Sequence, residues 1–218
     1  MKKEKKNIAD LREEYLRYSL EISQVAKHPI VQFEAWFREI QNTDNSEPNV
    51  MTLATSTIDG KPSARIVLLK GIEEDGFVFY TNYSSRKGKE LALNPNAALV
   101  FCWLEMERQV RIEGIVKKVS EHESEVYFQS RPKGSQIGAW ASPQSRVIDN
   151  RDILEKKAAE LEKKFAKTDK LPLPDAWGGY KLIPSMLEFW QGRSNRLHDR
   201  IRYTLQSDKQ WKIERLAP

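Results

Sequence analysis

The chain has 218 residues, enough to bury a core but short for two independent ones, so we expect a single structural domain. Hydrophobic residues make up 39% and charged residues 31%, and no apolar run reaches the roughly 20 residues that cross a bilayer, so we expect no membrane segment. The single cysteine excludes a disulfide framework, and the three separated histidines offer no metal-ligand spacing. The basic start lacks the apolar stretch of an export signal, which predicts a cytoplasmic protein.

Two helical patterns open the chain. Leu11, Tyr15 and Tyr18 recur at helical spacing, and a second run with the same spacing follows Pro29, a residue suited to a first helical turn. From Val50 the hydrophobic period changes to that of short strands. We expect strands over residues 49–58, 62–72, 77–82, 97–104 and 109–119, with turns at Asp59-Gly60 and Asp75-Gly76. Such a run of antiparallel strands favours a closed or nearly closed β-barrel.

The second half of the chain returns to helices and then to strands. Ser120 and Glu123 predict a capping box for a helix through Ser130, and Pro132 disfavours a helical conformation at Arg131. A further amphipathic helix is expected over 154–165, before C-terminal strands over 178–184, 187–192, 200–205 and 211–216. The fold class is therefore mainly β with flanking helices, an α+β protein.

Cationic residues stand where the predicted strands end. The dinucleotide fingerprint and the P-loop are both absent, so side chains must do much of the holding of any phosphate. On a regular strand Arg65 and Lys70 would point to opposite faces and could serve two different anions. The segment 84–89, SSRKGK, is either a phosphate cradle at a helix start or an ordinary capped helix with a basic surface.

Two further clusters combine residue types that bind anions. Tyr127, Arg131 and Ser135 form the donor set that a phosphate monoester prefers. A strand through RLHDR would place Arg196 and His198 on one face together with Arg200. Those charges either lie against an anionic or π-rich ligand, or are solvated or paired with Asp199.

Segments along nearly the whole chain resemble one family in order. They are RIVLLK, FYTNYSSRKGKEL, ERQVRIEG, YFQSRPKGSQIGAWAS, PQS, WGGY, EFWQGRSNRLHDR and RLAP. They resemble the pyridoxamine 5′-phosphate oxidase family. The resemblance implies an FMN-binding split β-barrel that works as a homodimer, with FMN in a cleft between the two chains. It also implies an N-terminal helical segment over 1–45 that includes a candidate active-site lid, and a split-barrel domain over 46–218.

The family's functional residues carry over position by position onto this chain. The resemblance assigns FMN contacts to Arg65, Ile66, Val67, Leu68, Leu69, Lys70, Tyr80, Thr81, Arg86, Lys87, Gln109, Gln144, Ser145, Trp190 and Arg200. It assigns substrate contacts to Arg12, Tyr15, Lys70, Tyr127, Arg131, Ser135, Arg196, Leu197 and His198, with Arg196 and His198 in the catalytic roles near the pyridine ring. In the candidate lid, Arg12 and Tyr15 match the family's pair, whereas Glu13 and Tyr18-Ser19-Leu20 depart from its usual basic residue and glycines.

The implied reaction is the oxidation of pyridoxine or pyridoxamine 5′-phosphate to pyridoxal 5′-phosphate, with O2 as electron acceptor and H2O2 as product. Because the flavin supplies the redox chemistry, the protein has to bind and orient the substrate. One alternative is a flavin oxidase of the same superfamily that acts on another aromatic compound, such as a phenazine precursor. A second alternative, from another class, is a basic β-barrel that binds RNA on aromatic platforms.

Overall fold

The computed structural model describes residues 7–8, 14–45 and 47–218, so Arg12 of the candidate lid lies outside the described residues. The chain divides into two compact units. The first unit comprises Met1–Pro48, Phe101–Arg111 and Met186–Pro218, and the second comprises Asn49–Val100 and Ile112–Ser185. In the described part of the chain, no helix has both the length and the apolar character needed to cross a membrane.

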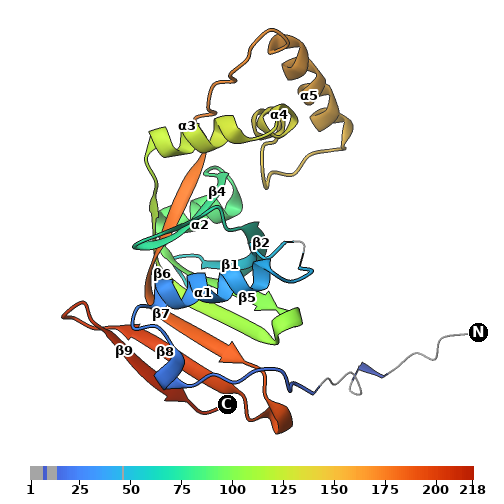
Figure 1. Cartoon of the computed structure of the whole chain (residues 1–218). Helices are drawn as coiled ribbons and strands as arrows, with labels where there is room; N and C mark the ends of the chain where they lie inside the picture. The colour runs from blue at the N-terminus through green and yellow to red at the C-terminus, as the bar shows by residue number, and fades with distance from the viewer. Residues whose placement is uncertain (1–6, 9–13, 46) are drawn as a thin grey trace, which may run out of the picture. The chain divides into compact units, whose positions relative to one another are not determined.

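One sheet carries the strands of the fold (Figure 1). The strands are β1 (Val50–Ser56), β2 (Pro62–Leu68), β3 (Gly71–Glu73), β4 (Gly76–Asn82), β5 (Asn96–Trp103), β6 (Arg108–Lys118), β7 (Trp177–Gln191), β8 (Asp199–Leu205) and β9 (Trp211–Leu216). Their order is β2-β1-β5-β6-β7-β4-β3, while β8 pairs with β7 and β9. The helices are α1 (Pro29–Gln41), α2 (Arg86–Leu93), α3 (Glu121–Ser130), α4 (Lys133–Ala141) and α5 (Asp152–Lys164), with short 3-10 turns η2 (Ile22–Gln24), η3 (Leu104–Met106) and η4 (Ser194–Arg196). The antiparallel half-barrel with flanking helices confirms the predicted fold class.

In the second unit, the expected strand over 62–72 is broken after Leu68. The reason is a change of hydrogen-bonding partner. Residues up to Leu68 pair with β1, Leu69 donates its amide to the Asn49 carbonyl at 2.8 Å, and the Lys70 amide then donates to Val78 on β4 at 2.8 Å. The expectation that Arg65 and Lys70 share one regular strand is therefore wrong, because Lys70 lies in the link between β2 and β3.

In the second unit, α2 and α3 begin at the capping serines that the sequence predicts, whereas α4 and α5 begin without a side-chain cap. Ser85 caps α2 by accepting a hydrogen bond from the Gly88 amide, and Ser120 with Glu123 forms the expected capping box of α3. Arg131 is extended before Pro132, as the proline requires. Figure 1 shows α3, α4 and α5 gathered together, and their apolar side chains enclose a separate small core. Its buried members are Phe128, Ile137, Leu161, Phe165, Leu171 and Trp177.

The first unit buries one face of α1 among aromatic residues. Phe33 is fully buried and lies 4.9 Å from the ring of Phe101, and Trp36 meets Phe189 edge to face at 5.2 Å. The expected helix around Leu11, Tyr15 and Tyr18 is wrong where the structure describes it, because residues 14–21 are irregular. Their backbone amides bond to distant carboxylates instead of to a preceding helical turn, as in the contacts of Arg17 with Glu107 and of Leu20 with Asp199.

Candidate functional site

A buried carboxylate joins two cationic side chains in the second unit. Glu90 on α2 is 5% exposed, and its Oε2 accepts hydrogen bonds from Ser63 at 2.7 Å and from Thr55 at 2.5 Å. Nη2 of Arg65 lies 3.3 Å from the same oxygen, and Nε of Arg86 donates to Oε1 at 2.8 Å. Burial raises the pKa of Glu90, but the hydrogen bonds from Thr55, Ser63 and Arg86 outweigh it and lower the pKa to about 2. The carboxylate is therefore ionised at neutral pH.

A half-buried lysine lies beside this network. Nζ of Lys87 donates to Thr81 Oγ1 at 3.2 Å and to Gln144 Oε1 at 3.0 Å, so it contacts neutral groups. Burial lowers the pKa of Lys87, and the positive charge of Arg65 acts in the same direction. Among the described residues no carboxylate is paired with Lys87. A partly desolvated ammonium without a counterion favours the binding of an anion at this place.

Three aromatic rings stack in the second unit. Tyr80 lies 3.9 Å from Tyr127 and 5.4 Å from Trp177 between ring centroids, with interplanar angles of 20° and 11°. Nζ of Lys70 lies 5.9 Å from the centroid of the Tyr127 ring. Burial, followed by the charge of Glu123, raises the pKa of Tyr80 to about 12. The Tyr80 phenol therefore keeps its proton at neutral pH and can donate a hydrogen bond.

Arg131 extends this stack with a second cation. Its guanidinium carbon lies 4.9 Å from the centroid of Trp177 and 5.8 Å from that of Phe128, and burial lowers its pKa. Nη1 of Arg131 is buried and has no hydrogen-bond partner among the residues that the structure describes. Buried donors are seldom left unpaired in folded proteins, so this nitrogen is available to a ligand. Ser135 is exposed in the first turn of α4.

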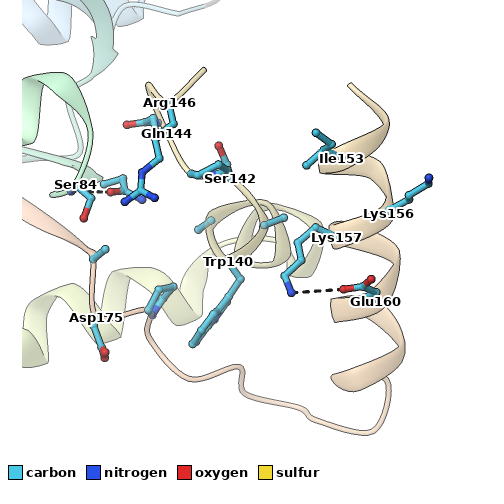
Figure 2. Close-up of a pocket in the computed structure, with 16 residues that line it drawn as sticks. Ser84, Trp140, Ser142, Gln144, Arg146, Ile153, Lys156, Lys157, Glu160 and Asp175 are labelled. Carbon is cyan, nitrogen blue, oxygen red and sulfur yellow. Dashed lines mark hydrogen bonds and ion pairs between the residues drawn. The ribbon is translucent and has the colours of Figure 1, made fainter. Parts of the chain in front are cut away.

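Two cavities adjoin these residues in the second unit. A cavity of about 460 Å³ is lined by residues that include Arg86, Glu90, Gln144 and Ser145. A larger cavity of about 740 Å³ shares Ser84, Gln144 and Arg146 with it and continues over α4 and α5. Figure 2 shows Gln144 and Arg146 near Ser84 on one side of this larger cavity and Trp140 with the ion pair of Lys157 and Glu160 on the other.

The edge strand β2 carries most of the consecutive residues 65–70 to which the resemblance assigns FMN contacts. Ile66, Val67 and Leu68 lie on β2, which is the first strand in the sheet order, and Leu69 follows directly. Ile66 is 63% exposed. Nη1 of Arg65 reaches back to the Leu53 carbonyl at 3.2 Å, which fixes the stem of that side chain against β1.

The first unit gathers three of the assigned aromatic residues. The ring centroids of Trp190 and His198 are 4.5 Å apart, and Tyr15 lies 5.8 Å from Trp190 and 6.0 Å from His198. A Cβ added to Gly192 would lie 2.7 Å from Cγ of Tyr15, so the close approach of the tyrosine requires glycine at this position. The structure thus places Tyr15 of the candidate lid against Trp190 and His198, although not on a helix.

The expected strand through Arg196 and His198 is wrong. Residues Ser194–Arg196 form η4, and β8 begins only at Asp199. Asn195 and Arg196 are both in the left-handed region, with φ of 54° and 61°, a conformation that is uncommon for residues other than glycine and is often found at functional sites. The loop is closed by the backbone amide of Arg193, which donates to Nδ1 of His198 at 3.1 Å. Arg196 is exposed, and Leu197 is 69% exposed.

Asp199 binds cations other than those proposed for it. Its Oδ2 accepts hydrogen bonds from the Leu20 amide at 3.1 Å and from Arg193 at 3.0 Å, and its Oδ1 accepts one from Arg215 at 2.6 Å. The alternative in which Asp199 neutralises Arg196 and Arg200 is therefore wrong. Asp199 instead joins the N-terminal segment, the loop before His198 and β9.

Arg200 and Gln109 complete the assigned residues of the first unit. Arg200 is the cross-strand partner of Trp190 and binds both carboxylate oxygens of Glu188, at 2.8 Å and 3.1 Å. That pairing raises the pKa of Arg200. Gln109 is half-buried on β6.

The site contains contributors that pattern analysis did not single out. Trp177 underlies both Tyr80 and Arg131, and Glu90 holds two arginines. The Gly-Gly pair after Trp177 is the only sequence signal for a close approach there, since Cβ atoms at Gly178 and Gly179 would lie within 2.3 Å and 2.7 Å of neighbouring atoms. No local pattern marks Glu90, because an acidic residue on a short amphipathic helix is ordinarily solvated.

An antiparallel half-barrel that carries stacked aromatic rings beside cations with no carboxylate partner in the described part of the chain suits the binding of small anionic aromatic molecules. Comparison with known proteins makes this class specific. Residues 38–165 match the family model "Pyridoxamine 5'-phosphate oxidase", and residues 177–218 match "Pyridoxine 5'-phosphate oxidase C-terminal dimerisation region". The chain belongs to the pyridoxamine 5′-phosphate oxidase family.

Curated relatives and solved structures agree with this membership. Proteins named pyridoxine/pyridoxamine 5′-phosphate oxidase from Burkholderia mallei and Burkholderia thailandensis are 57% identical over 213 residues, covering 97% of this chain and 99% of theirs. PhzG from Burkholderia lata 383, solved in complex with tetrahydrophenazine-1-carboxylic acid, has a TM-score of 0.87 and 32% identity, covering 94% of this chain and 100% of its own. An FMN-binding protein from Nostoc punctiforme, with a TM-score of 0.70 at 18% identity over 89% of this chain and 100% of its own, shares the fold.

Proposed function

We propose that the protein oxidises pyridoxine 5′-phosphate and pyridoxamine 5′-phosphate to pyridoxal 5′-phosphate, with FMN as cofactor and O2 as the electron acceptor that yields H2O2. The observation that carries the proposal is Arg131. Its guanidinium is held on the face of Trp177 with a buried nitrogen that lacks a partner among the described residues. A phosphate monoester supplies the missing acceptor and the missing negative charge.

The residues present fit FMN. Arg65 and Arg86 share the single carboxylate of Glu90, and Lys87 adds a third positive charge near Arg65, so the cluster keeps an excess of positive charge that suits a cofactor phosphate. Thr81 and Gln144 add neutral polar groups beside Lys87. When bound, FMN supplies the acceptor for the two electrons removed from C4′ of the substrate. We propose that Gln109, Ser145, Trp190, Arg200 and the β2 run complete the set of cofactor contacts.

The protein's own part is to bind and orient the substrate. We assign the 5′-phosphate to Lys70, Tyr127, Arg131 and Ser135. The Tyr127 ring stacks with Tyr80 and Trp177. Lys70 lies beside the Tyr127 ring, and the guanidinium of Arg131 lies beside the Trp177 ring. We assign the pyridine ring to Arg196, Leu197 and His198. Because the amide of Arg193 donates to Nδ1 of His198, neutral His198 carries its proton on Nε2 and offers a hydrogen-bond donor there.

The match of residues 177–218 to a dimerisation region supports a homodimer. We propose that FMN binds at the interface of that dimer, in the cytoplasm. We also propose that the N-terminal segment with Arg12 and Tyr15 covers the substrate. The contact of the Tyr15 ring with Trp190 and Gly192 supports this role.

The absorbance spectrum of the purified protein tests the proposal. We expect a yellow protein with stoichiometric FMN, whose flavin absorbance bleaches with pyridoxine 5′-phosphate in the absence of air and returns when air is admitted, with formation of pyridoxal 5′-phosphate. Turnover indistinguishable from background would overturn the substrate assignment and leave the flavin assignment standing. A colourless protein with tight, salt-sensitive RNA binding would overturn both.

The similarity to PhzG favours one alternative, a flavin oxidase that acts on a reduced phenazine precursor. The whole set of Lys70, Tyr127, Arg131 and Ser135 argues against it, because a substrate without a phosphate group would not need so many hydrogen-bond donors. Parallel assays with pyridoxine 5′-phosphate and with tetrahydrophenazine-1-carboxylic acid separate the two activities. We expect turnover with the phosphorylated substrate only.

A further inference from the structure

Within the part of the chain that the structure describes, Glu90 is the one acidic side chain that contacts the cationic cluster formed by Arg65, Arg86 and Lys87. Its side chain is buried, whereas the side chain of Arg86 is 63% exposed. Taken by its charge alone, a buried carboxylate at this place would weaken an anion site. Its geometry argues for a different effect.

Each oxygen of Glu90 binds a different arginine. Oε1 accepts the Nε hydrogen of Arg86 at 2.8 Å, which leaves the two terminal nitrogens of Arg86 without partners among the described residues. Oε2 lies 3.3 Å from Nη2 of Arg65, and Ser63 also accepts a hydrogen bond from that nitrogen. A long, flexible guanidinium side chain loses rotamer freedom when it binds a ligand, and a fixed partner reduces that loss in advance.

The carboxylate itself is held by further hydrogen bonds. Thr55 and Ser63 donate to Oε2 from β1 and β2, and α2 supplies the backbone of Glu90. Because its pKa is lowered to about 2, the carboxylate stays ionised through the range in which the enzyme would work. Two strands and a helix thus meet at one ionised side chain. Because this carboxylate is fixed, the two arginines that bind it are held in place as well.

We propose that Glu90 is a positioning residue for the cofactor phosphate, holding Arg65 and Arg86 in the orientation that binds it. The inference rests on the proposed FMN site. A purely electrostatic role of Glu90 and a positioning role predict opposite changes in phosphate affinity when the carboxylate is removed. Loss of the negative charge would strengthen phosphate binding, whereas loss of the orientation would weaken it.

The experiment is a titration of flavin-free protein with FMN, for the wild type and for Glu90→Gln. Binding is monitored through the quenching of flavin fluorescence. The amide keeps the shape of the carboxylate and makes the cluster more cationic. We expect the Kd for FMN to rise by about tenfold or more, the loss typical of a charged hydrogen bond. An unchanged or lower Kd would overturn the inference.

The Kd for riboflavin, which lacks the phosphate, distinguishes a lost phosphate contact from a general loss of structure. Only a general loss of structure would weaken riboflavin binding. We expect Glu90→Gln to bind riboflavin as the wild type does, so that only the preference for FMN over riboflavin falls. Equal weakening of both ligands would overturn the positioning role. The matched control is Glu73→Gln, which removes a carboxylate of the same unit that pairs with Lys181 and should leave both Kd values unchanged.

A milder variant covers the case in which Glu90→Gln does not fold. Ser63→Ala removes one donor to Glu90 and one acceptor of Arg65 while leaving the charge unchanged, and we expect a rise of about threefold in the Kd for FMN. An unchanged Kd in this variant would overturn the inference. If wild-type protein failed to bind FMN, the proposed function would fall and the inference with it, whereas tight binding by wild type and variants alike would remove the inference alone.

Discussion

The backbone amide of Arg193 donates a hydrogen bond to Nδ1 of His198 at 3.1 Å. This contact closes the loop before β8 and determines which ring nitrogen of neutral His198 carries the proton. A proton added at Nδ1 would meet the amide hydrogen directly. The bond therefore links the protonation state of His198 to the conformation of the loop that carries Arg196.

The first prediction concerns pH. Burial lowers the pKa of His198, and the charge of Arg196 lowers it further. We expect kcat/KM to fall on acidification, with a midpoint below the ordinary histidine value of about 6.5, because protonation removes the acceptor of the Arg193 amide. In Arg196→Gln the midpoint should move upward, independently of the loss in rate. A pH profile of each enzyme measures this, and an acid limb that stays at the same pH in the variant would contradict it.

The second prediction concerns the substrate phosphate. Replacing Arg131 with leucine should raise KM by about 10- to 150-fold, equivalent to roughly 1.5–3 kcal/mol for a lost charged hydrogen bond, while the protein retains FMN. Steady-state kinetics and the flavin absorbance of the same preparation provide both values. Lys133→Leu is the matched control, because Lys133 is exposed and bonds to the Thr168 carbonyl. Loss of flavin with an unchanged KM would mean that the two phosphate sites are interchanged.

The third prediction concerns the N-terminal segment. Asp199→Asn should weaken the contacts to the Leu20 amide, Arg193 and Arg215 and cost about 1–3 kcal/mol in the free energy of unfolding. Because the segment loses an anchor, trypsin should cleave after Arg17 several times faster than in the wild type. Digestion followed by mass spectrometry measures the rate. Glu214→Gln, on the neighbouring β9, should not accelerate the cleavage, since Glu214 pairs with Arg202 and Lys212.

The fourth prediction concerns stability in acid. The folded-state pKa of Glu90 is about 2, below the roughly 4.3 of an unperturbed glutamate, so the ionised network contributes stability above pH 4.3. That contribution should be lost as the pH falls from there toward 2. The free energy of unfolding of the wild type, minus that of Glu90→Gln, should therefore shrink across this range. A difference that does not vary with pH would show that the ionised form is not favoured by folding.

Much of the fold follows from interactions between residues close together in the chain. The capping box of Ser120 and Glu123 and the effect of Pro132 on Arg131 depend on a few neighbouring residues, and both were predicted correctly. The same holds for α1 after Pro29 and for the hairpin turn at Asp59-Gly60, where Gly60 has a φ of 84°. These features are local, so the sequence alone can predict them.

The candidate site depends on contacts that span the chain. The sequence pattern indicated Tyr127 with Arg131, but not Trp177, which stacks with Tyr80 from another strand. It also predicted a strand through Arg196, whereas the bond between Arg193 and His198 and the anchoring of Asp199 produce a turn. Resemblance to a family suggested which of these residues contact FMN or substrate. It did not show how their side chains are arranged in space.

The sequence by itself predicted α1, α2, α3 and α5, most strand positions and the family, because capping, alternation and motifs are properties of short segments. It did not predict α4, and it predicted a helix around Tyr15 and Tyr18 that the structure does not contain. Only the tertiary structure decided that the chain leaves β1 for β4 after Leu68, and that Asp199 holds the Leu20 amide. The physical reason is that a buried polar group must find a partner wherever the fold supplies one, and that partner can be far away in the chain. Asp199 shows both cases, because it accepts a hydrogen bond from Arg193, six residues away, and another from the Leu20 amide, 179 residues away.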